Sequence, residues 1–84
     1  MEVLVKKKAF KQLSKLPKKV QKRFALKLNI FKEDQFHPLL NNHSVEGVYP
    51  GCRSINITGD YRALYYIQGD LFIFIEIGTH SELY

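Results

Sequence analysis

The sequence has few of the residues on which small disulfide-bonded or metal-binding domains depend. Its 84 residues include a single cysteine, Cys52, and no tryptophan. A lone cysteine cannot form an internal disulfide, and it excludes a zinc site built on several thiolates. We expect Cys52 to be a half-buried strand residue rather than a nucleophile. The composition favours a reducing, cytoplasmic setting, and it predicts neither a metal nor a small-molecule cofactor.

Long hydrophobic runs are also missing. The apolar stretch from Leu71 to Ile77 has the length of a strand, and the apolar residues within 1–5 are too few for a signal peptide or a membrane span. Repeats, low-complexity tracts and linkers are not visible, so residues 1–84 are expected to form one domain. A core of this size cannot enclose a large pocket, and an active site should lie on an open face or in a shallow groove.

Acidic residues are scarce in the first part of the chain. Residues 1–33 contain eleven lysines and arginines against Glu2 and Glu33, a balance of +9, whereas residues 34–84 have a balance of −4. The basic residues that we single out for contact with RNA are Lys18, Lys22 and Arg23. Lysines are also common on solvated helix surfaces, but a block of this density favours contact with a polyanion.

Apolar spacing predicts a strand and two helices in the first part of the chain. Alternation indicates a strand over residues 2–7, and the period then changes to that of a short helix over residues 8–16. Pro17 suits the first turn of a second helix. The apolar stripe of this helix is formed by Val20, Phe24, Leu28 and Phe31. A membrane-surface helix has a similar pattern, but this stripe is needed to cover a sheet, so no membrane partner is expected.

Three strands are predicted after a connector over residues 34–50. They span residues 52–57, 61–67 and 71–77, and the short glycine-containing turns between them require antiparallel hairpins. The order β-α-α-β-β-β predicts an α+β domain in which two helices pack on one face of a mainly antiparallel sheet. Strict alternation places Ile75 and Ile77 on one face of the last strand and Phe74 and Glu76 on the other. The face without helices is where we expect a site.

The tail Ile77–Tyr84 reads I-G-T-H-S-E-L-Y and directly follows the last strand. It places a histidine and an aromatic ring at the rim of the sheet, where a ligand can reach a proton-transfer group and a stacking surface. A structural explanation is also available, because Thr79 and Glu82 match a helix capping box and an exposed histidine is an ordinary surface residue.

The stretch G-C-R-S-I-N-I-T-G-D-Y-R over residues 51–62 and the G-T-H-S-E-L-Y ending resemble the RelE/ParE superfamily of bacterial toxins, and most of all its YafQ-type branch. The resemblance extends over nearly the whole chain. It implies the toxin of a toxin–antitoxin pair, with a cognate antitoxin protein as partner. RelE-like and YafQ-like members cut messenger RNA on the ribosome without metal, whereas ParE-like members inhibit DNA gyrase.

The resemblance carries over to individual positions of this sequence. The matched positions are His43, Asp60, Tyr61, His80 and Tyr84. Two positions depart from the YafQ-like pattern, since Asn56 stands where a histidine is expected and Glu76 where an arginine is expected. Arg62 resembles the arginine that RelE-like members place on the middle strand.

These residues could support metal-independent cutting of RNA. His80 would act as the acid, and His43 or Asp60 as the base that accepts the 2′-hydroxyl proton. The phosphate would be held by Arg62 together with Arg53. Tyr84 and Tyr61 would stack on a base, while Asn56 would supply hydrogen bonds. The lysine-rich helices would contact ribosomal RNA. The alternatives are a ParE-like gyrase inhibitor and a weakened toxin that binds RNA or antitoxin without cutting.

Overall fold

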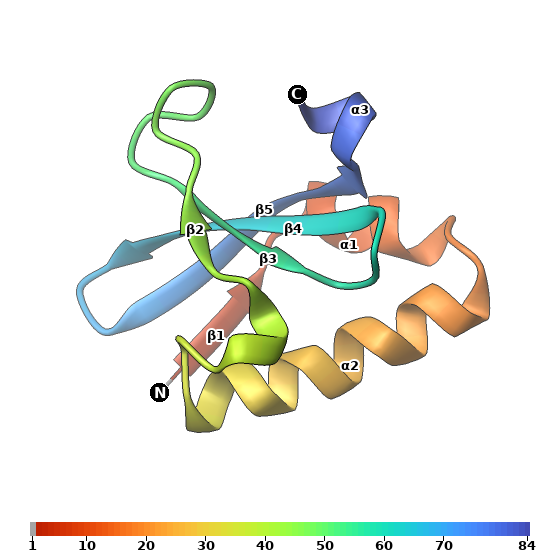
Figure 1. The fold of residues 1–84 in the computed structure, drawn as a ribbon, viewed down its shortest axis with the longest axis horizontal. Helices are drawn as coiled ribbons and strands as arrows, with labels where there is room; N and C mark the ends of the chain where they lie inside the picture. Colours follow the sequence, from red (N-terminus) through yellow and green to blue (C-terminus); the bar gives the residue numbers. More distant parts are fainter. Residues whose placement is uncertain (1) are drawn as a thin grey trace.

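The computed structural model describes residues 2–84, in which two helices cover one face of a five-stranded sheet (Figure 1). The strands are β1 (Glu2–Val5), β2 (His43–Ser44), β3 (Arg53–Asn56), β4 (Tyr61–Gln68) and β5 (Leu71–Thr79). The helices are α1 (Lys7–Ser14), α2 (Lys18–Glu33), the 3₁₀ turn η1 (Pro38–Leu40) and α3 (His80–Leu83). The predicted α+β class and the β-α-α-β-β-β order are confirmed.

The sheet has the order β1-β5-β4-β3-β2. β1 pairs in parallel with β5, and every other neighbouring pair is antiparallel. The strand β2 and the turn η1 lie in the segment that the sequence predicted to be a connector without regular structure. A strand of two residues is too short to show a period, which is why the apolar pattern did not reveal it.

Side-chain hydrogen bonds hold this connector on the sheet. The hydroxyl oxygen of Tyr65 accepts from Gln35 Nε2 at 2.9 Å and from Asn42 Nδ2 at 2.7 Å. The Oδ1 atom of Asn42 in turn accepts from Arg53 Nε at 2.8 Å. Asn41 adopts a left-handed backbone with φ of 47°, a conformation that asparagine tolerates better than most residues. The length of the connector therefore does not leave it detached from the sheet.

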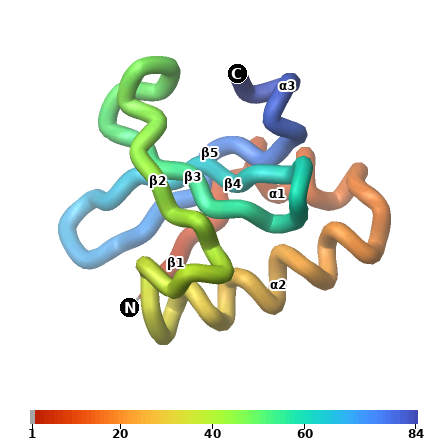
Figure 2. The backbone as a smooth tube through the Cα atoms, in the orientation of Figure 1, coloured from red at the N-terminus to blue at the C-terminus, as the bar shows by residue number. Residues whose placement is uncertain are grey.

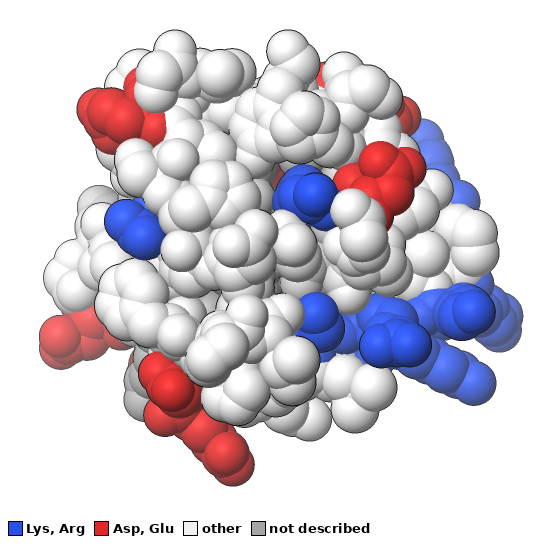
Figure 3. Space-filling model, in the orientation of Figure 1, with Lys and Arg blue, Asp and Glu red and all other residues white. Residues whose placement is uncertain are grey.

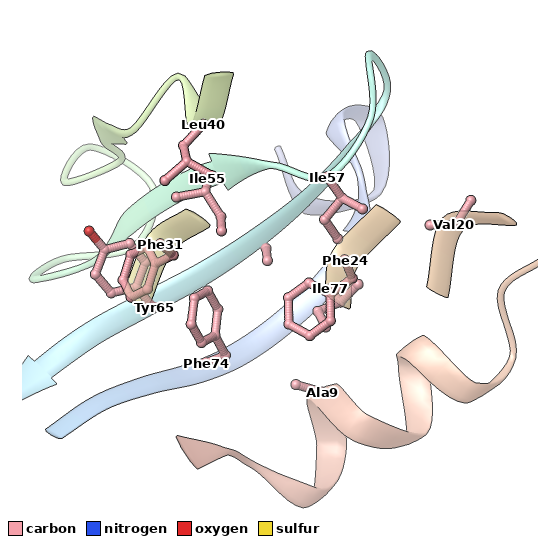
Figure 4. Close-up of a cluster of buried hydrophobic side chains, with 11 residues drawn as sticks. Ala9, Val20, Phe24, Phe31, Leu40, Ile55, Ile57, Tyr65, Phe74 and Ile77 are labelled. Atoms are coloured by element: carbon pink, nitrogen blue, oxygen red, sulfur yellow. The ribbon is translucent and has the colours of Figure 1, made fainter. Parts of the chain in front are cut away.

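The main core lies between the helices and the sheet (Figure 4). From α2 it receives Val20, Phe24 and Phe31, as the predicted stripe requires, while Leu28 is only partly buried. Phe31 is fully buried, and its ring centroid lies 5.0 Å from that of Tyr65 and 5.4 Å from that of Phe74. Edge-on aromatic contacts of this kind add to the free energy gained from apolar burial alone.

A β-bulge changes the predicted faces of β5. Leu64 pairs with Glu76 and Tyr65 pairs with Phe74, which leaves Ile75 as an extra residue in β5. As a result Ile77 joins the main core on the same side as Phe74, although strict alternation had placed the two on opposite faces. The prediction for Ile77 was wrong because an inserted residue reverses the alternation beyond it.

A second, smaller apolar cluster lies on the other face of the sheet. Figure 2 shows the loop after β2 and the helix α3 rising from this side. The buried members of the cluster are Val45, Cys52, Leu64 and Leu83. Burial raises the pKa of the Cys52 thiol, and this agrees with the expected packing role. The face without helices is therefore partly covered, and the open area is confined to its margins.

No helix within residues 2–84 combines the length and the apolar character that crossing a membrane requires.

Candidate functional site

One corner of the sheet brings together three of the residues singled out from the sequence. The register pairs Tyr61 with Thr79 and Arg62 with Gly78, so the start of β4 lies beside the end of β5. The backbone N–H of His80 donates to the carbonyl oxygen of Asp60 at 3.0 Å. His80, Asp60 and Arg62 are consequently neighbours in this corner, which we call the His80 corner.

The β3–β4 turn over residues 57–60 is closed by hydrogen bonds on both sides. The hydroxyl of Thr58 accepts from the backbone N–H of Asp60 at 3.3 Å and from that of Tyr61 at 3.1 Å. From the strand, Arg62 Nη1 donates to the carbonyl oxygens of Thr58 at 3.2 Å and Gly59 at 3.0 Å. One guanidinium nitrogen of Arg62 therefore fixes the turn, while its Nε and Nη2 have no hydrogen-bond partner among residues 2–84.

The short helix α3 is held by a capping box, as the sequence suggested. The hydroxyl of Thr79 accepts from the Glu82 N–H at 3.2 Å, and Glu82 Oε1 accepts from the Thr79 N–H at 2.8 Å. The hydrogen bonds from Thr79 lower the pKa of the Glu82 carboxyl. There is little room for a side chain at Gly78, because a Cβ there would lie 3.2 Å from Glu82 Oε1 and 3.5 Å from the Leu83 side chain. The capping role of Thr79 and Glu82 is therefore compatible with a site at His80, since the capping box fixes the backbone at His80.

The imidazole of His80 contacts the ring of Tyr84. Their centroids are 4.6 Å apart and the ring planes meet at 64°, an edge-on arrangement. His80 is exposed, and Tyr84 is 38% exposed. Both rings are therefore open to a ligand while each restricts the orientation of the other.

His43 does not lie in the His80 corner. It is in β2, where it pairs with Ser54 of β3, and β2 is separated from β5 by β3 and β4. Three steps between neighbouring strands amount to about 14 Å. The Nδ1 atom of His43 lies 2.7 Å from the carbonyl oxygen of Asn41. The expectation that His43 and His80 converge on one bond is not met, because sequence alone does not give the position of β2 in the sheet.

Arg53 and Tyr61 also lie apart from the corner's open side. Arg53 donates to Asn42, its guanidinium lies 5.3 Å from the ring centroid of Phe36, and its pairing partner is Tyr65 rather than a corner residue. It therefore cannot share a phosphate with Arg62. The ring of Tyr61 packs against the main core on the helix-covered face, so little of it is free to stack on a base.

Three cations of α2 border a groove beside the β3–β4 turn. This groove has a volume of about 410 Å³, and its basic lining residues are Lys19, Arg23 and Lys27. On the face shown in Figure 3, lysine and arginine atoms gather over α2 next to this turn. Asn56 also lines the groove, whereas Lys18 and Lys22 are exposed outside it. Lys19 and Lys27 belong to the basic set of the sequence but were not singled out for contact with RNA, although their spacing of four residues on either side of Arg23 indicates a single helix face.

Glu76, which replaces an expected arginine, holds α1 against the edge of β5. Its Oε1 accepts from Lys8 Nζ at 2.6 Å and its Oε2 from Gln12 Nε2 at 2.8 Å. Gln12 Oε1 also accepts from the backbone N–H of Ile77 at 2.8 Å, which satisfies an edge donor that β1 does not reach. The alternative in which Glu76 pairs with Arg62 is therefore wrong, since Arg62 lies opposite Gly78 and bonds to the turn.

Replacing Glu76 by glutamine is expected to lower the free energy of unfolding near neutral pH by about 1 kcal/mol, through loss of a partly screened charged hydrogen bond. Burial raises the pKa of this carboxyl, but the hydrogen bonds from Lys8 and Gln12 and the charge of Lys8 outweigh it, so the net pKa lies below its usual 4.5. A depressed pKa contributes stability above the unfolded-state value and loses it as the pH falls through the folded-state value.

The measurement is urea unfolding of the parent and Glu76→Gln at neutral and at acidic pH, with Glu2→Gln as a control that removes the same charge from an exposed strand end. The difference should be present at neutral pH and vanish in acid. A difference that stays constant with pH would show that the Glu76 charge does not stabilise the fold.

Comparisons with known proteins agree with the fold. The profile of the family described as "Bacterial toxin of type II toxin-antitoxin system, YafQ" matches residues 4–84. Among solved structures, YafQ from E. coli strain BL21(DE3) is 14% identical with a TM-score of 0.81, covering 99% of this chain and 97% of that one. The YoeB/ParE toxin from Agrobacterium tumefaciens is 16% identical with a TM-score of 0.79, covering 95% and 99%.

A third solved structure similar to this chain is the RelB–RelE antitoxin–toxin complex from Methanococcus jannaschii, which is 23% identical with a TM-score of 0.77 and covers 96% of this chain and 94% of that one. No curated protein matches the chain. At these identities the solved structures establish the fold, and the family profile, which spans nearly every residue, establishes membership. The chain therefore belongs to the YafQ family of toxins from bacterial type II toxin–antitoxin systems.

Proposed function

We propose that this toxin is a metal-independent endoribonuclease that cuts messenger RNA on the translating ribosome, in the cytoplasm, and that a cognate antitoxin protein restrains it. The observation that carries the proposal is the His80 corner, where the backbones of His80 and Asp60 are hydrogen-bonded, Arg62 lies opposite Gly78, and the exposed ring of Tyr84 contacts the imidazole. A titratable acid, a carboxylate, a guanidinium and a stacking surface are the groups that cleavage of a phosphodiester by acid–base chemistry requires.

In the proposed reaction the ribose 2′-oxygen attacks the adjacent phosphorus while the bond from phosphorus to the 5′-oxygen breaks. Asp60 accepts the proton of the 2′-hydroxyl, and His80 donates a proton to the departing 5′-oxygen. The negative charge that develops on the phosphate faces the Nε and Nη2 donors of Arg62. His43 has no part in these steps, because the sheet order keeps it away from the corner. Tyr84 remains the stacking residue, since its ring is exposed beside His80.

The test is to add purified protein to a translation reaction and map the ends of the message. Discrete cuts that require ribosomes support the proposal, and they should persist when a chelator is present at a level that spares the ribosomes. Intact message together with loss of DNA supercoiling would instead support a gyrase inhibitor.

A weakened toxin is a second candidate because of two particular contacts. Glu76 is an acidic residue bonded to Lys8 and Gln12, and Arg62 Nη1 is bonded to the turn, so Arg62 has only part of its guanidinium free for a phosphate. A protein that sediments with ribosomes yet leaves the message uncut in the same reaction would favour this second candidate.

A further inference from the structure

The groove between α2 and the β3–β4 turn contains unbalanced positive charge. Its lining includes Lys19, Arg23 and Lys27, and no carboxylate of residues 2–84 contributes to it. These three residues lie four apart on α2, so they form a row with steps of about 6 Å along the helix axis. Neighbouring positive charges without acidic partners repel one another, and an anion in the groove would relieve that repulsion.

Lys27 is the most constrained cation of this row. Burial lowers the pKa of its ammonium group, and the nearby charge of Arg23 lowers it further. The ammonium donates to the carbonyl oxygens of Leu39 at 3.0 Å and Asn56 at 3.4 Å, so neutral acceptors hold it in place in the lining of the groove. A fixed and partly desolvated cation contributes more to anion binding than a freely moving surface lysine.

From this geometry we infer that the groove binds the sugar–phosphate backbone of a single RNA strand. Evenly spaced cations along a groove match a polymer that carries one charge per unit. An acidic peptide fits less well for two reasons. β3 pairs with β4 along its length and with β2 at Arg53 and Ser54, and the carbonyl oxygen of Asn56 already accepts from Lys27, so little free strand edge remains for a peptide here. The apolar residues Val20 and Ile57 at the groove are buried, which leaves Leu39 as the main exposed apolar contact.

The β3–β4 turn joins this groove to the His80 corner. Thr58 and Gly59 line the groove, and their carbonyl oxygens accept from Arg62 on the corner's side. A strand whose reacting bond lies at His80 can therefore continue across the turn into the groove. In taking RNA as the polyanion the inference rests on the proposed function, but it adds a backbone site separate from the reacting groups.

The experiment measures binding of a short fluorescent single-stranded RNA, without ribosomes, over a range of salt concentrations. The His80→Gln background keeps the RNA intact. In this background Lys19→Ala/Arg23→Ala removes two groove cations that make no hydrogen bonds within residues 2–84. The matched control is Lys7→Ala/Lys11→Ala, which removes two exposed lysines with the same spacing from α1. Lys27→Met, with its folding checked by circular dichroism, is the third variant.

For a single strand each phosphate contact contributes about 0.7 to the slope of log affinity against log salt, so the groove pair should reduce the slope by about 1.4. The control pair should leave the slope nearly unchanged, and Lys27→Met should reduce it by about 0.7. Equal effects of the groove and control pairs would show that only net charge matters and would overturn the inference. The inference would also be overturned if binding of a poly-glutamate peptide depended on the groove cations while the salt slope of RNA binding did not.

This readout separates the inference from the proposed function. A protein that fails to cut ribosome-bound message but shows the slope change in the groove pair has the backbone site without the activity. Conversely, the protein has the activity without the backbone site if it cuts message while the groove-pair and control-pair variants bind RNA with the same salt slope.

Discussion

Replacing His80 by glutamine is expected to lower the rate of message cutting by about 10²- to 10⁴-fold, the usual contribution of a general acid. Glutamine can still form hydrogen bonds, but it cannot give a proton to the departing oxygen. The backbone N–H of His80 bonds to Asp60 whatever the side chain, and the capping box of Thr79 and Glu82 does not use the imidazole. Single-turnover cutting in a translation reaction, measured by primer extension, reports the loss.

The matched control is His37→Asn, which changes a histidine outside the corner. His37 Nδ1 accepts from the Leu39 N–H at 3.1 Å, and asparagine can supply a similar acceptor. This variant should cut message at the rate of the parent protein. Both variants should have the same midpoint of urea unfolding as the parent. A His80→Gln protein that cuts as fast as the parent would exclude His80 as the acid, whereas a loss shared with His37→Asn would indicate a general effect on folding.

Replacing Phe31 by alanine is expected to lower the free energy of unfolding by about 3–5 kcal/mol. The Phe31 ring is fully buried and meets the rings of Tyr65, Phe72 and Phe74 with centroid distances of 5.0, 5.3 and 5.4 Å. Its removal leaves a cavity that these neighbours cannot fill without leaving their own contacts. Small domains have a total stability of about 5–15 kcal/mol, so this one change removes a large share of it.

Urea unfolding followed by circular dichroism measures the effect, with Phe10→Ala as the control. Phe10 lies on α1 and is 61% exposed, so its loss should change the free energy of unfolding by less than about 0.5 kcal/mol. Similar losses at both positions would mean that the packing of α2 on the sheet is not the main source of stability. The comparison thus tests the core independently of any activity.

The fold could be predicted from the sequence wherever the periodic spacing of apolar residues extended over several helical turns or over a whole hairpin. The stripe of Val20, Phe24 and Phe31 predicted how α2 packs, and the glycine-containing turns fixed the antiparallel neighbours of β4. Two local features escaped this reasoning. The strand β2 has only two residues, and the extra residue Ile75 reverses the alternation of β5 without leaving a mark in the apolar pattern.

The candidate site could be predicted only where the residues are joined by short segments. His80 and Arg62 meet because one hairpin determines the register of β4 and β5. His43 lies in a segment whose place in the sheet depends on hydrogen bonds between distant residues, such as that of Asn42 with Tyr65. Likewise, nothing local to Glu76 indicated that Lys8 and Gln12, more than sixty positions earlier, would bond to it.

The place of β5 in the sheet has a consequence for synthesis of the chain. β5 lies between β1 and β4, yet it follows both of them in the sequence. A nascent polypeptide that has not yet reached Leu71 leaves β1 with no neighbouring strand and β4 with one edge bare, so cooperative folding must wait. His80 emerges directly after β5. An incomplete translation product therefore lacks both the complete sheet and the proposed acid, so we expect a stalled or truncated copy not to cut message.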